Sequence, residues 1–190
     1  MLFLTLAAEY AASENEVLEA LLARIAKSDK DALADLYERT RTAVYGFVMS
    51  ISQCHADAED VLQETYINVF SSADRYRPQG KPMAWILTIS KNLARMRLRE
   101  LKRQTELPDD DWSLYFASNP AVSADEAILL NAAMKKLTEE EKRIVLLHAV
   151  SGLKHREVAE LLEIPTATVL SKYARAIKKL KAAMEVEHNE

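Results

Sequence analysis

Apolar residues in this chain recur three and four positions apart, and no stretch alternates strictly between apolar and polar residues. Two early segments have their apolar positions at Val17, Leu18, Leu21, Leu22 and Ile25, then at Leu33, Leu36, Tyr37, Val44, Val48 and Ile51. Such spacing places apolar side chains on one face of an α-helix, whereas a half-buried strand requires alternation. The chain has only 3 glycines in 190 residues, which also favours helices. The sequence therefore predicts an all-α fold.

Helix starts are marked by capping boxes, in which a serine or threonine is followed three residues later by glutamate. Such pairs occur at Ser13 and Glu16, at Ser123 and Glu126, and at Thr138 and Glu141. Together with the apolar spacing, they predict helices over about 14–26, 57–70, 82–104, 124–136 and 139–151, and one more that contains the apolar positions from Leu33 to Ile51. Gly152 is placed to end the last of these helices.

The stretch after residue 104 interrupts the helical pattern. Residues 105–125 contain two prolines, an acidic cluster and no sustained periodicity, which predicts a flexible acidic linker between two small helical domains. The expected organisation is an extension with one helix at 1–27, domains at 28–104 and 126–185, and a tail at 186–190.

Charge is segregated along the chain, although the net charge is only −4. Residues 81–103 hold seven basic side chains and one acidic one, a net charge of +6, and residues 154–181 hold seven basic and three acidic ones, a net charge of +4. Between them, residues 105–126 carry six acidic side chains and no lysine or arginine. Basic segments of this kind indicate nucleic-acid contacts, which the average charge conceals.

The cellular location follows from the cysteine count and from the first residues. Cys54 is the single cysteine, so no internal disulfide can form and a reducing compartment is expected. The apolar start MLFLTLAAEYAA has no basic leading segment and is too short to span a bilayer. We expect a cytoplasmic protein that is not inserted in a membrane.

Two helical patterns meet at a three-residue break within HREVAELLEIPTATVLSKYARAIKKLK, residues 155–181. Pro165 ends the first helix because the residue before a proline is disfavoured in the helical region, and Thr166 can cap the second. The apolar positions of the first helix, about 154–162, are Val158, Ala159 and Leu162. A short break beside a small residue such as Ala159 is typical of a helix-turn-helix.

The second of these helices separates its chemistry onto two faces. One face carries Val169, Tyr173, Ala176 and Leu180, at core spacing. The opposite face offers hydroxyls near the start of the helix and cations along its length, which suits base edges and phosphates of DNA. The candidate DNA-contacting residues are Thr166, Thr168, Ser171, Lys172, Arg175 and Lys179. An ordinary amphipathic helix with a solvated basic face is the alternative.

The helix that begins near Pro82 repeats this division. Trp85, Ile89, Leu93 and Met96 form its apolar stripe, and basic residues lie opposite. Aromatic residues beside a basic face suit stacking with unpaired bases, although a tryptophan on an apolar stripe is more often core. From the residues alone, the candidates for this second nucleic-acid surface are Tyr76, Arg77, Trp85, Thr88, Lys91, Arg95 and Arg99.

The segment DAEDVLQETYINVF has the opposite charge. Its residues Leu62, Tyr66 and Val69 are expected to face inward, and Asp57, Asp60 and Glu64, with Val61 beside them, are expected on the outer face. An acidic patch on a DNA-binding domain cannot hold phosphate, so a protein partner is the natural interpretation, although the helix dipole alone favours acidic residues near a helix start.

The chain is similar to a known family in both halves. DAEDVLQETYINVF followed by AWILTISKNLA resembles region 2 of the sigma-70 family, especially its small extracytoplasmic-function (ECF) group. LTEEEKRIVLLHAVSGLKHREVAELLEIPTATVLSKYARAIKKL resembles region 4 of the same family. The resemblance spans about 28–104 and 126–182.

The resemblance implies a promoter-specificity subunit of RNA polymerase. Its expected partners are core RNA polymerase, promoter DNA and an anti-sigma factor, with no cofactor and no small-molecule substrate. Region 2 would bind the polymerase clamp through Asp60, Gln63 and Glu64, and would hold the melted −10 element through Lys91, Asn92 and Arg95. Region 4 would read the −35 element through Thr168, Ser171, Lys172 and Arg175, and the acidic linker would pass through the nucleic-acid channels of the polymerase.

Four positions depart from the family pattern. Glu163 stands where a glycine is common in the turn, Ala167 replaces another frequent glycine, Leu170 replaces a lysine and Met96 replaces an aspartate. These departures bear on which promoter sequence is preferred.

Two other classes of protein compete with this interpretation. A stand-alone helix-turn-helix regulator would bind its operator without polymerase, and the acidic face and acidic linker argue against it. An enzyme or a metal site is disfavoured because Cys54 and His55 are adjacent, His148, His155 and His188 form no two-histidine motif, and no phosphate-binding glycine loop or nucleophile signature occurs.

Overall fold

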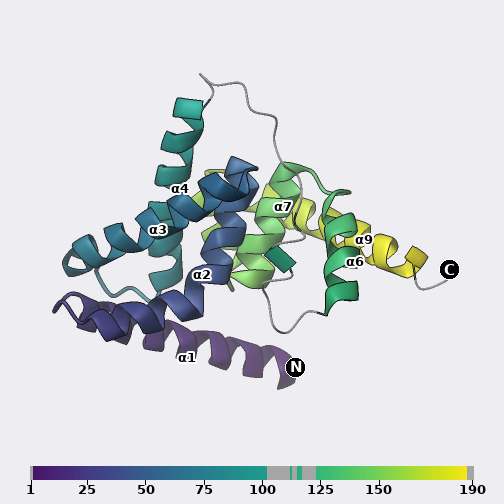
Figure 1. The fold of residues 1–190 in the computed structure, drawn as a ribbon. Helices are drawn as coiled ribbons and strands as arrows, with labels where there is room; N and C mark the ends of the chain where they lie inside the picture. The colour runs from purple at the N-terminus through teal and green to yellow at the C-terminus, as the bar shows by residue number, and fades with distance from the viewer. Residues whose placement is uncertain (1, 102–111, 113–114, 117–122, 188–190) are drawn as a thin grey trace.

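The computed structural model describes residues 2–101, 112, 115–116 and 123–187, and these residues contain helices and no strands. Figure 1 shows the helices as two groups that lie side by side, one from the first half of the chain and one from the second. The α-helices are α1 (Leu2–Ile25), α2 (Lys30–Ser52), α3 (His55–Ser72), α4 (Pro82–Leu101), α6 (Ala124–Met134), α7 (Glu139–Val145), α8 (His155–Leu162) and α9 (Thr166–Glu187). The predicted all-α fold is confirmed.

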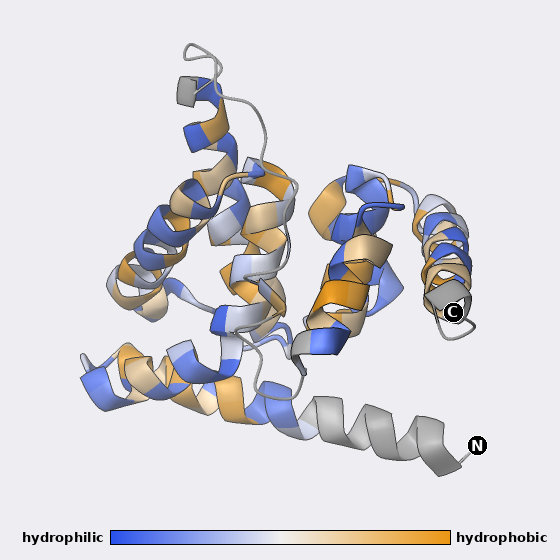
Figure 2. Ribbon diagram, turned by 45° about the vertical axis from the view of Figure 1, so that its right-hand side comes forward, coloured by the Kyte–Doolittle hydropathy of each residue, from blue (hydrophilic) through white to orange (hydrophobic). Residues whose placement is uncertain are grey.

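The first group is built around α2. This helix packs against α1, α3 and α4, which bury its apolar face. Leu36, Val44 and Val48 are buried as the spacing predicts, and so are Leu62, Tyr66 and Val69 of α3. Figure 2 shows hydrophilic and hydrophobic residues on each of these helices, in line with their amphipathic sequences. A helical bundle of this kind is stabilised mainly by burial of the apolar helix faces against one another.

The first predicted helix start is wrong. Helix α1 begins at Leu2, so Ser13 lies inside the helix and does not cap it. The preceding residues, LTLAAEYAA, are mostly good helix formers, and nothing in them interrupts the helix before Ser13. A capping box marks a start only where the chain before it leaves the helical conformation.

The two other predicted capping boxes are confirmed. The Ser123 side chain accepts from the backbone N–H of Glu126 and starts α6, and Thr138 does the same with Glu141 at α7. The predicted helix at 139–151 is α7 followed by one π-helical turn, Leu146–Val150. Gly152 ends it with a φ of +70°, the left-handed conformation that glycine adopts without strain.

Two aromatic residues of the predicted linker are anchored in the core. Trp112 and Tyr115 are 1 % and 4 % exposed, and the backbone N–H of Trp112 donates to Oδ1 of Asn131 in α6 at 2.9 Å. Tyr115 lies against Gly46 of α2, where a Cβ atom would stand 2.8 Å from the tyrosine ring. These two residues therefore contact both groups of helices.

The two groups of helices also touch directly. Helix α2 packs against α7 and its π-helical turn, and α4 packs against α8. The Arg143 Nε donates to the backbone carbonyl of Ser50 at 3.2 Å, which ties α7 to α2. The sequence did not predict how the two halves lie relative to each other. In the structure they share an interface.

Candidate nucleic-acid and partner-binding surfaces

A hollow of about 350 Å³ lies where the loop before α4 meets the first turns of that helix. The rings of Tyr76 and Trp85 meet in it with centroids 5.1 Å apart. Its lining residues are Arg75, Tyr76, Arg77, Gln79, Lys81, Ala84, Trp85 and Thr88. Four residues that the sequence predicted as nucleic-acid contacts thus line the same hollow: Tyr76, Arg77, Trp85 and Thr88. An aromatic hollow with cations on its rim has the shape and charge to hold an unstacked base and its phosphate.

Glu19 of α1 holds this loop in position. Its Oε1 accepts from the hydroxyl of Tyr76 at 2.8 Å and from the backbone N–H groups of Gln79 and Gly80 at 3.0 and 2.8 Å. Burial, with the hydrogen bond to Glu19, raises the pKa of Tyr76 to about 12, so the phenol stays a donor. Sequence reasoning missed Glu19, since nothing in the sequence links it to a loop 57 or more residues away.

The outer face of α4 is only partly accessible. Thr88, Asn92, Arg95 and Arg99 are exposed, as expected for residues that face DNA. Lys91 differs because it is only 7 % exposed. Its Nζ donates to the backbone carbonyl of Leu161 at 2.8 Å and to Oε1 of Glu163 at 2.7 Å, and both acceptors belong to the other half of the chain.

The acidic surface on α3 is narrower than predicted. Asp60, Gln63 and Glu64 are exposed. The placement of Asp57 and Val61 on that exposed face is wrong, because they are 5 % and 2 % exposed. Helix α3 is covered on two sides, by α2 and α4, so its buried face is wider than one apolar stripe.

Arg97 of α4 accounts for the burial of a carboxylate at this position. Its Nε donates to Oδ1 of Asp57 at 2.9 Å, and its Nη2 donates to Oδ2 of Asp60 at 3.2 Å. A buried charge requires such a partner, and the pair ties α3 to α4. The exposed acidic surface thus consists of Asp60, Gln63 and Glu64.

The start of α9 differs slightly from the expectation. Thr166 is the first residue of the helix, and the backbone carbonyl of Pro165 accepts from the N–H groups of Thr168 and Val169. Thr166 is therefore exposed at the first helical position and is not the cap. Val169 and Ala176 are fully buried, so the predicted core face of the helix is confirmed.

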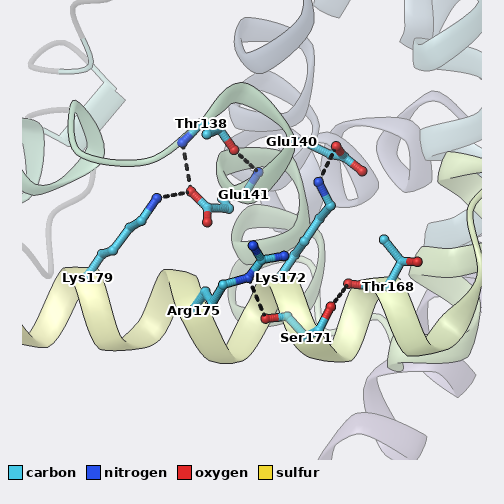
Figure 3. Close-up of polar contacts among 8 residues, drawn as sticks. All are labelled: Thr138, Glu140, Glu141, Thr168, Ser171, Lys172, Arg175 and Lys179. Carbon is cyan, nitrogen blue, oxygen red and sulfur yellow. Dashed lines mark hydrogen bonds and ion pairs between the residues drawn. The ribbon is translucent and has the colours of Figure 1, made fainter.

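The candidate residues of α9 fall into two groups, which Figure 3 shows. Ser171 and Arg175 are exposed, and the Nε of Arg175 donates to the carbonyl of Ser171 at 3.3 Å. Lys172 and Lys179 reach toward α7 instead, where their Nζ atoms lie 2.6 Å from Glu140 and 2.7 Å from Glu141. These lysines lie on the flank of the helix, beside the acidic start of α7.

Glu141 has two structural tasks at that point. It is 4 % exposed, and its Oε2 accepts from the backbone N–H of Thr138 at 2.9 Å and from Lys179 at 2.7 Å. Burial alone would raise the pKa of Glu141, but the hydrogen bonds from Lys179 and Thr138 outweigh it and lower the pKa. The carboxylate therefore stays charged and holds Lys179 against α7.

Sequence reasoning missed two cations on the exposed side of α9. Lys178 and Lys181 are exposed on this side, further along the helix than Ser171 and Arg175. The sequence contained the information for Lys178. It follows Ser171 by seven residues, close to two helical turns, so both residues lie on the same side of the helix. The outer surface of α9 therefore combines hydroxyls at its start with Arg175, Lys178 and Lys181 further along.

Comparison with known families covers both halves of the chain. The family model described as Sigma-70 region 2 matches residues 36–104. The family model described as Sigma-70, region 4 matches residues 127–180. The hollow and α4 lie in the first match, and α8 and the first fifteen residues of α9, 166–180, lie in the second.

Similar proteins and similar structures agree with these matches. The ECF RNA polymerase sigma factor SigK of Mycobacterium sp. (strain KMS) is 35 % identical over 177 residues, which cover 86 % of this chain and 89 % of that protein. SigK of Mycobacterium tuberculosis (strain ATCC 25618 / H37Rv) is 28 % identical over 176 residues, with 89 % and 94 % covered.

Two solved structures have the same fold. CnrH in complex with the cytosolic domain of CnrY is 22 % identical with a TM-score of 0.60, and the match covers 90 % of this chain and 98 % of that one. The sigma factor RpoE in complex with the anti-sigma factor NepR from Bartonella quintana is 23 % identical with a TM-score of 0.61, covering 83 % and 99 %. Both sigma regions in order, with a 35 % identical relative covered over most of its length, show that the chain belongs to the ECF group of the sigma-70 family.

Proposed function

We propose that this chain works as an ECF sigma factor through two DNA surfaces, one on α4 for the melted −10 element and one on α9 for the −35 element. Core RNA polymerase supplies catalysis, and the chain supplies promoter recognition. The observation that carries the proposal is the presence of two basic helical surfaces in one chain, in the order of sigma regions 2 and 4. A stand-alone regulator is not favoured, because the first half also matches a sigma region.

The −10 surface consists of the hollow and the outer face of α4. Tyr76 and Trp85 offer ring faces to a displaced base, and Arg75, Arg77 and Lys81 line the same hollow. Thr88, Asn92, Arg95 and Arg99 continue the surface along the helix. Lys91 is the remaining cation that we assign to it, although it is buried against α8 in this structure. Capture of single-stranded bases at this place would stabilise the melted promoter.

The −35 surface is the exposed side of α9. Ser171 and Arg175 lie where a recognition helix presents donors to base edges in the major groove. Lys172 and Lys179, held at the flank by Glu140 and Glu141, suit contacts with phosphates beside the groove. Thr166 and Thr168 supply hydroxyls at the start of the helix.

Core polymerase would bind the acidic surface formed by Asp60, Gln63 and Glu64. The chain would act in the cytoplasm with polymerase, and we also propose an anti-sigma factor as a partner, since the RpoE structure above is a complex with one. Within the described residues, no helix is long and apolar enough to cross a membrane. Residues 28–104 and 126–185 are the proposed functional halves, joined by 105–125.

Run-off transcription from genomic fragments tests the proposal. Core polymerase with the chain should yield transcripts that core polymerase alone does not. Arg175→Ala should lower their yield about 5-fold or more, since a bidentate base contact is worth about 1–3 kcal/mol. Wild-type yields with Arg175→Ala across a range of salt would reject the α9 assignment.

The acidic surface is tested separately. The double variant Asp60→Lys and Glu64→Lys should lose association with core polymerase while its helical circular dichroism stays unchanged, because both side chains are exposed and Arg97 keeps its bond to the buried Asp57. Asp35→Lys, an exposed charge reversal on α2, is the matched control and should bind normally. Unchanged co-purification of the double variant with core polymerase would reject this surface.

A further inference from the structure

The end of α8 and the turn after it lie against the basic face of α4. Glu163 accepts from Lys91 at 2.7 Å and from Nη1 of Arg95 at 3.4 Å, and Glu160 accepts from Lys81 at 3.1 Å. We refer to these ion pairs, together with the hydrogen bond from Lys91 to Leu161, as the α4–α8 contact. Three cations of the proposed −10 surface are thus paired with the helix-turn-helix of the same chain.

Lys91 makes this contact stronger than an ordinary surface pair. An ion pair between two exposed side chains contributes little, since water competes and both side chains lose freedom. The Lys91 side chain, however, is only 9 % exposed, and its ammonium group also bonds a carbonyl at the C-terminal end of α8, where the helix dipole is negative. A buried ammonium that loses Glu163 keeps its desolvation cost without its compensating anion.

The backbone at Glu163 supports a role for its carboxylate. Glu163 has φ of 62° and ψ of 39°, the left-handed conformation in which glycine is favoured and side chains with a Cβ are strained. Gly80 and Gly152 occupy comparable positive-φ positions elsewhere in the chain. A glutamate at this turn accepts backbone strain, and what it adds is the carboxylate that binds Lys91 and Arg95.

Both sides of the α4–α8 contact are surfaces that DNA would need. On one side are Lys91 and Arg95 of the proposed −10 surface, and on the other is the turn that leads into α9. A carboxylate on Lys91 occupies the place of a phosphate oxygen, since both are anionic acceptors for an ammonium group. The chain cannot present these cations to DNA while Glu163 holds them.

We propose that Glu163 is an internal competitor of DNA phosphate, which binds Lys91 and Arg95 and keeps the two halves of the free chain closed. The proposal rests on the assignment of α4 to DNA made above. Only open molecules can bind DNA at these cations. The apparent DNA affinity of the free chain is therefore the affinity of the open form multiplied by the fraction of molecules that are open. Binding of the two halves at separate sites on polymerase would break the α4–α8 contact and release the cations.

The experiment compares the free full-length chain with two variants at this position. Glu163→Gln removes the charge and keeps the size, and Glu163→Gly also relieves the left-handed strain. Small-angle X-ray scattering measures opening as a larger radius of gyration. Fluorescence anisotropy measures affinity for a labelled random-sequence single-stranded DNA of about 20 nucleotides, a length that spans the usual site sizes.

Two matched controls separate the contact from general effects. Glu59→Gln removes an equal charge from an exposed position on α3, so it reports the effect of net charge on DNA affinity. Ser28→Gly relieves a left-handed residue, with φ of 65°, outside the α4–α8 contact, so it reports the effect of strain alone. Both controls should keep the wild-type radius of gyration.

We expect both Glu163 variants to have a larger radius of gyration and about 10-fold tighter DNA binding, a typical size for coupling between sites. Glu163→Gln with a wild-type radius overturns the proposal, whatever Glu163→Gly does, and leaves the DNA assignment of α4 standing. A larger radius without tighter DNA binding overturns the competition with phosphate, and it also removes Lys91 and Arg95 from the −10 surface.

Discussion

Helices α4 and α9 are both basic, and glutamates neutralise part of each, but the glutamates come from different places. The lysines at the flank of α9 bind Glu140 and Glu141 of α7, in the same half of the chain. Lys91 and Arg95 of α4 bind Glu163 in the turn after α8, and Lys81 just before α4 binds Glu160 of α8, so these glutamates belong to the opposite half. Pairs within one half can persist when DNA binds, whereas pairs between halves must break if the halves separate.

This difference explains how one chain can hold a folded helix that we propose reads DNA together with a proposed DNA surface that is restrained. In α9, Glu141 orients a lysine and caps α7 at the same time, so the pair belongs to the folded domain. At α4, the partner side chains Glu160 and Glu163 come from α8 and the turn after it and are 53 % and 63 % exposed, so water and ions can reach their carboxylates when the halves part. The pairs of α9 hold its lysines in position. The pairs at α4 leave its cations available to DNA only when the two halves separate.

The largest effect should come from Trp112, which links the two halves together with Tyr115. Trp112→Ala removes a side chain that is 1 % exposed and should lower the free energy of unfolding by about 3–5 kcal/mol, the usual cost of a large-to-small change in a core. Urea denaturation measures it. Because Trp112 touches the second half and Tyr115 the first, we also expect the two halves to unfold in separate transitions.

Ile128→Ala is the matched control for that prediction. Ile128 is a large apolar residue of α6 with 68 % exposure, so its truncation should change the free energy of unfolding by less than about 0.5 kcal/mol. A Trp112→Ala protein with wild-type stability and a single transition would contradict the anchoring role.

A smaller loss of stability should follow from Glu141→Ala, which tests a pair that lies within one half of the chain. The variant loses the capping bond to Thr138 and the pair with Lys179, so we expect a loss of about 1–3 kcal/mol in the free energy of unfolding. The radius of gyration should stay at the wild-type value, because both bonds lie within one half. An increase in that radius would show that pairs within a half also control opening.

Glu126→Ala serves as the control at the other capping box. Its carboxylate is bonded to Ser123 and is exposed, so its loss should cost no more than about 1 kcal/mol. Equal losses for the two variants would mean that burial and Lys179 add nothing at Glu141.

The smallest effect should be a pH dependence on the core side of α9. The ring of His155 lies 3.9 Å from that of His148 and 5.1 Å from that of Tyr173, and its Nε2 is buried with no hydrogen-bond partner within the described residues. Burial, with the nearby His148, lowers the pKa of His155 below its ordinary value of 6.5. Its position at the start of α8 also disfavours the charged ring.

The direction of the pH dependence follows from that lowered pKa. Below pH 6.5 the unfolded chain takes up a proton that the folded chain resists, so the free energy of unfolding should fall as pH drops from 7.5 to 5.5. Urea denaturation at the two pH values measures the fall, and His155→Phe should make it smaller. An equal fall in wild type and variant would assign the pH dependence to other groups.

The sequence was most informative where one helix face decides the outcome. The apolar spacing predicted the core of α2 and α9, and the hydroxyls and cations of α9 were found by their place opposite that core. The prediction failed at Asp57 and Val61, because helix spacing shows one stripe and not the second neighbour that covers α3. Trp112 and Tyr115 were interpreted as part of the linker. Three aromatic residues directly after the acidic residues 109–111, namely Trp112, Tyr115 and Phe116, could have indicated that this part of the linker packs against the helices.

The α4–α8 contact was beyond sequence reasoning for a different physical reason. It joins side chains 68 to 79 positions apart in the chain, and no local pattern determines which helices of two separate bundles meet. The one local signal was Glu163, which stands where the family commonly has glycine. Its charge could be connected with α4 only when the two halves were placed together.

The distance between the two halves, with and without core polymerase, tests the central claim most directly. Spin labels at Ser71→Cys in α3 and Lys136→Cys after α6 occupy exposed positions outside both proposed DNA surfaces, with Cys54 replaced by serine. Pulsed electron paramagnetic resonance on the free chain should give one well-defined distance. Core polymerase and promoter DNA should shift it to a longer one. A transcribing complex that keeps the distance of the free chain would contradict the account, since the α4–α8 contact would then be compatible with promoter binding.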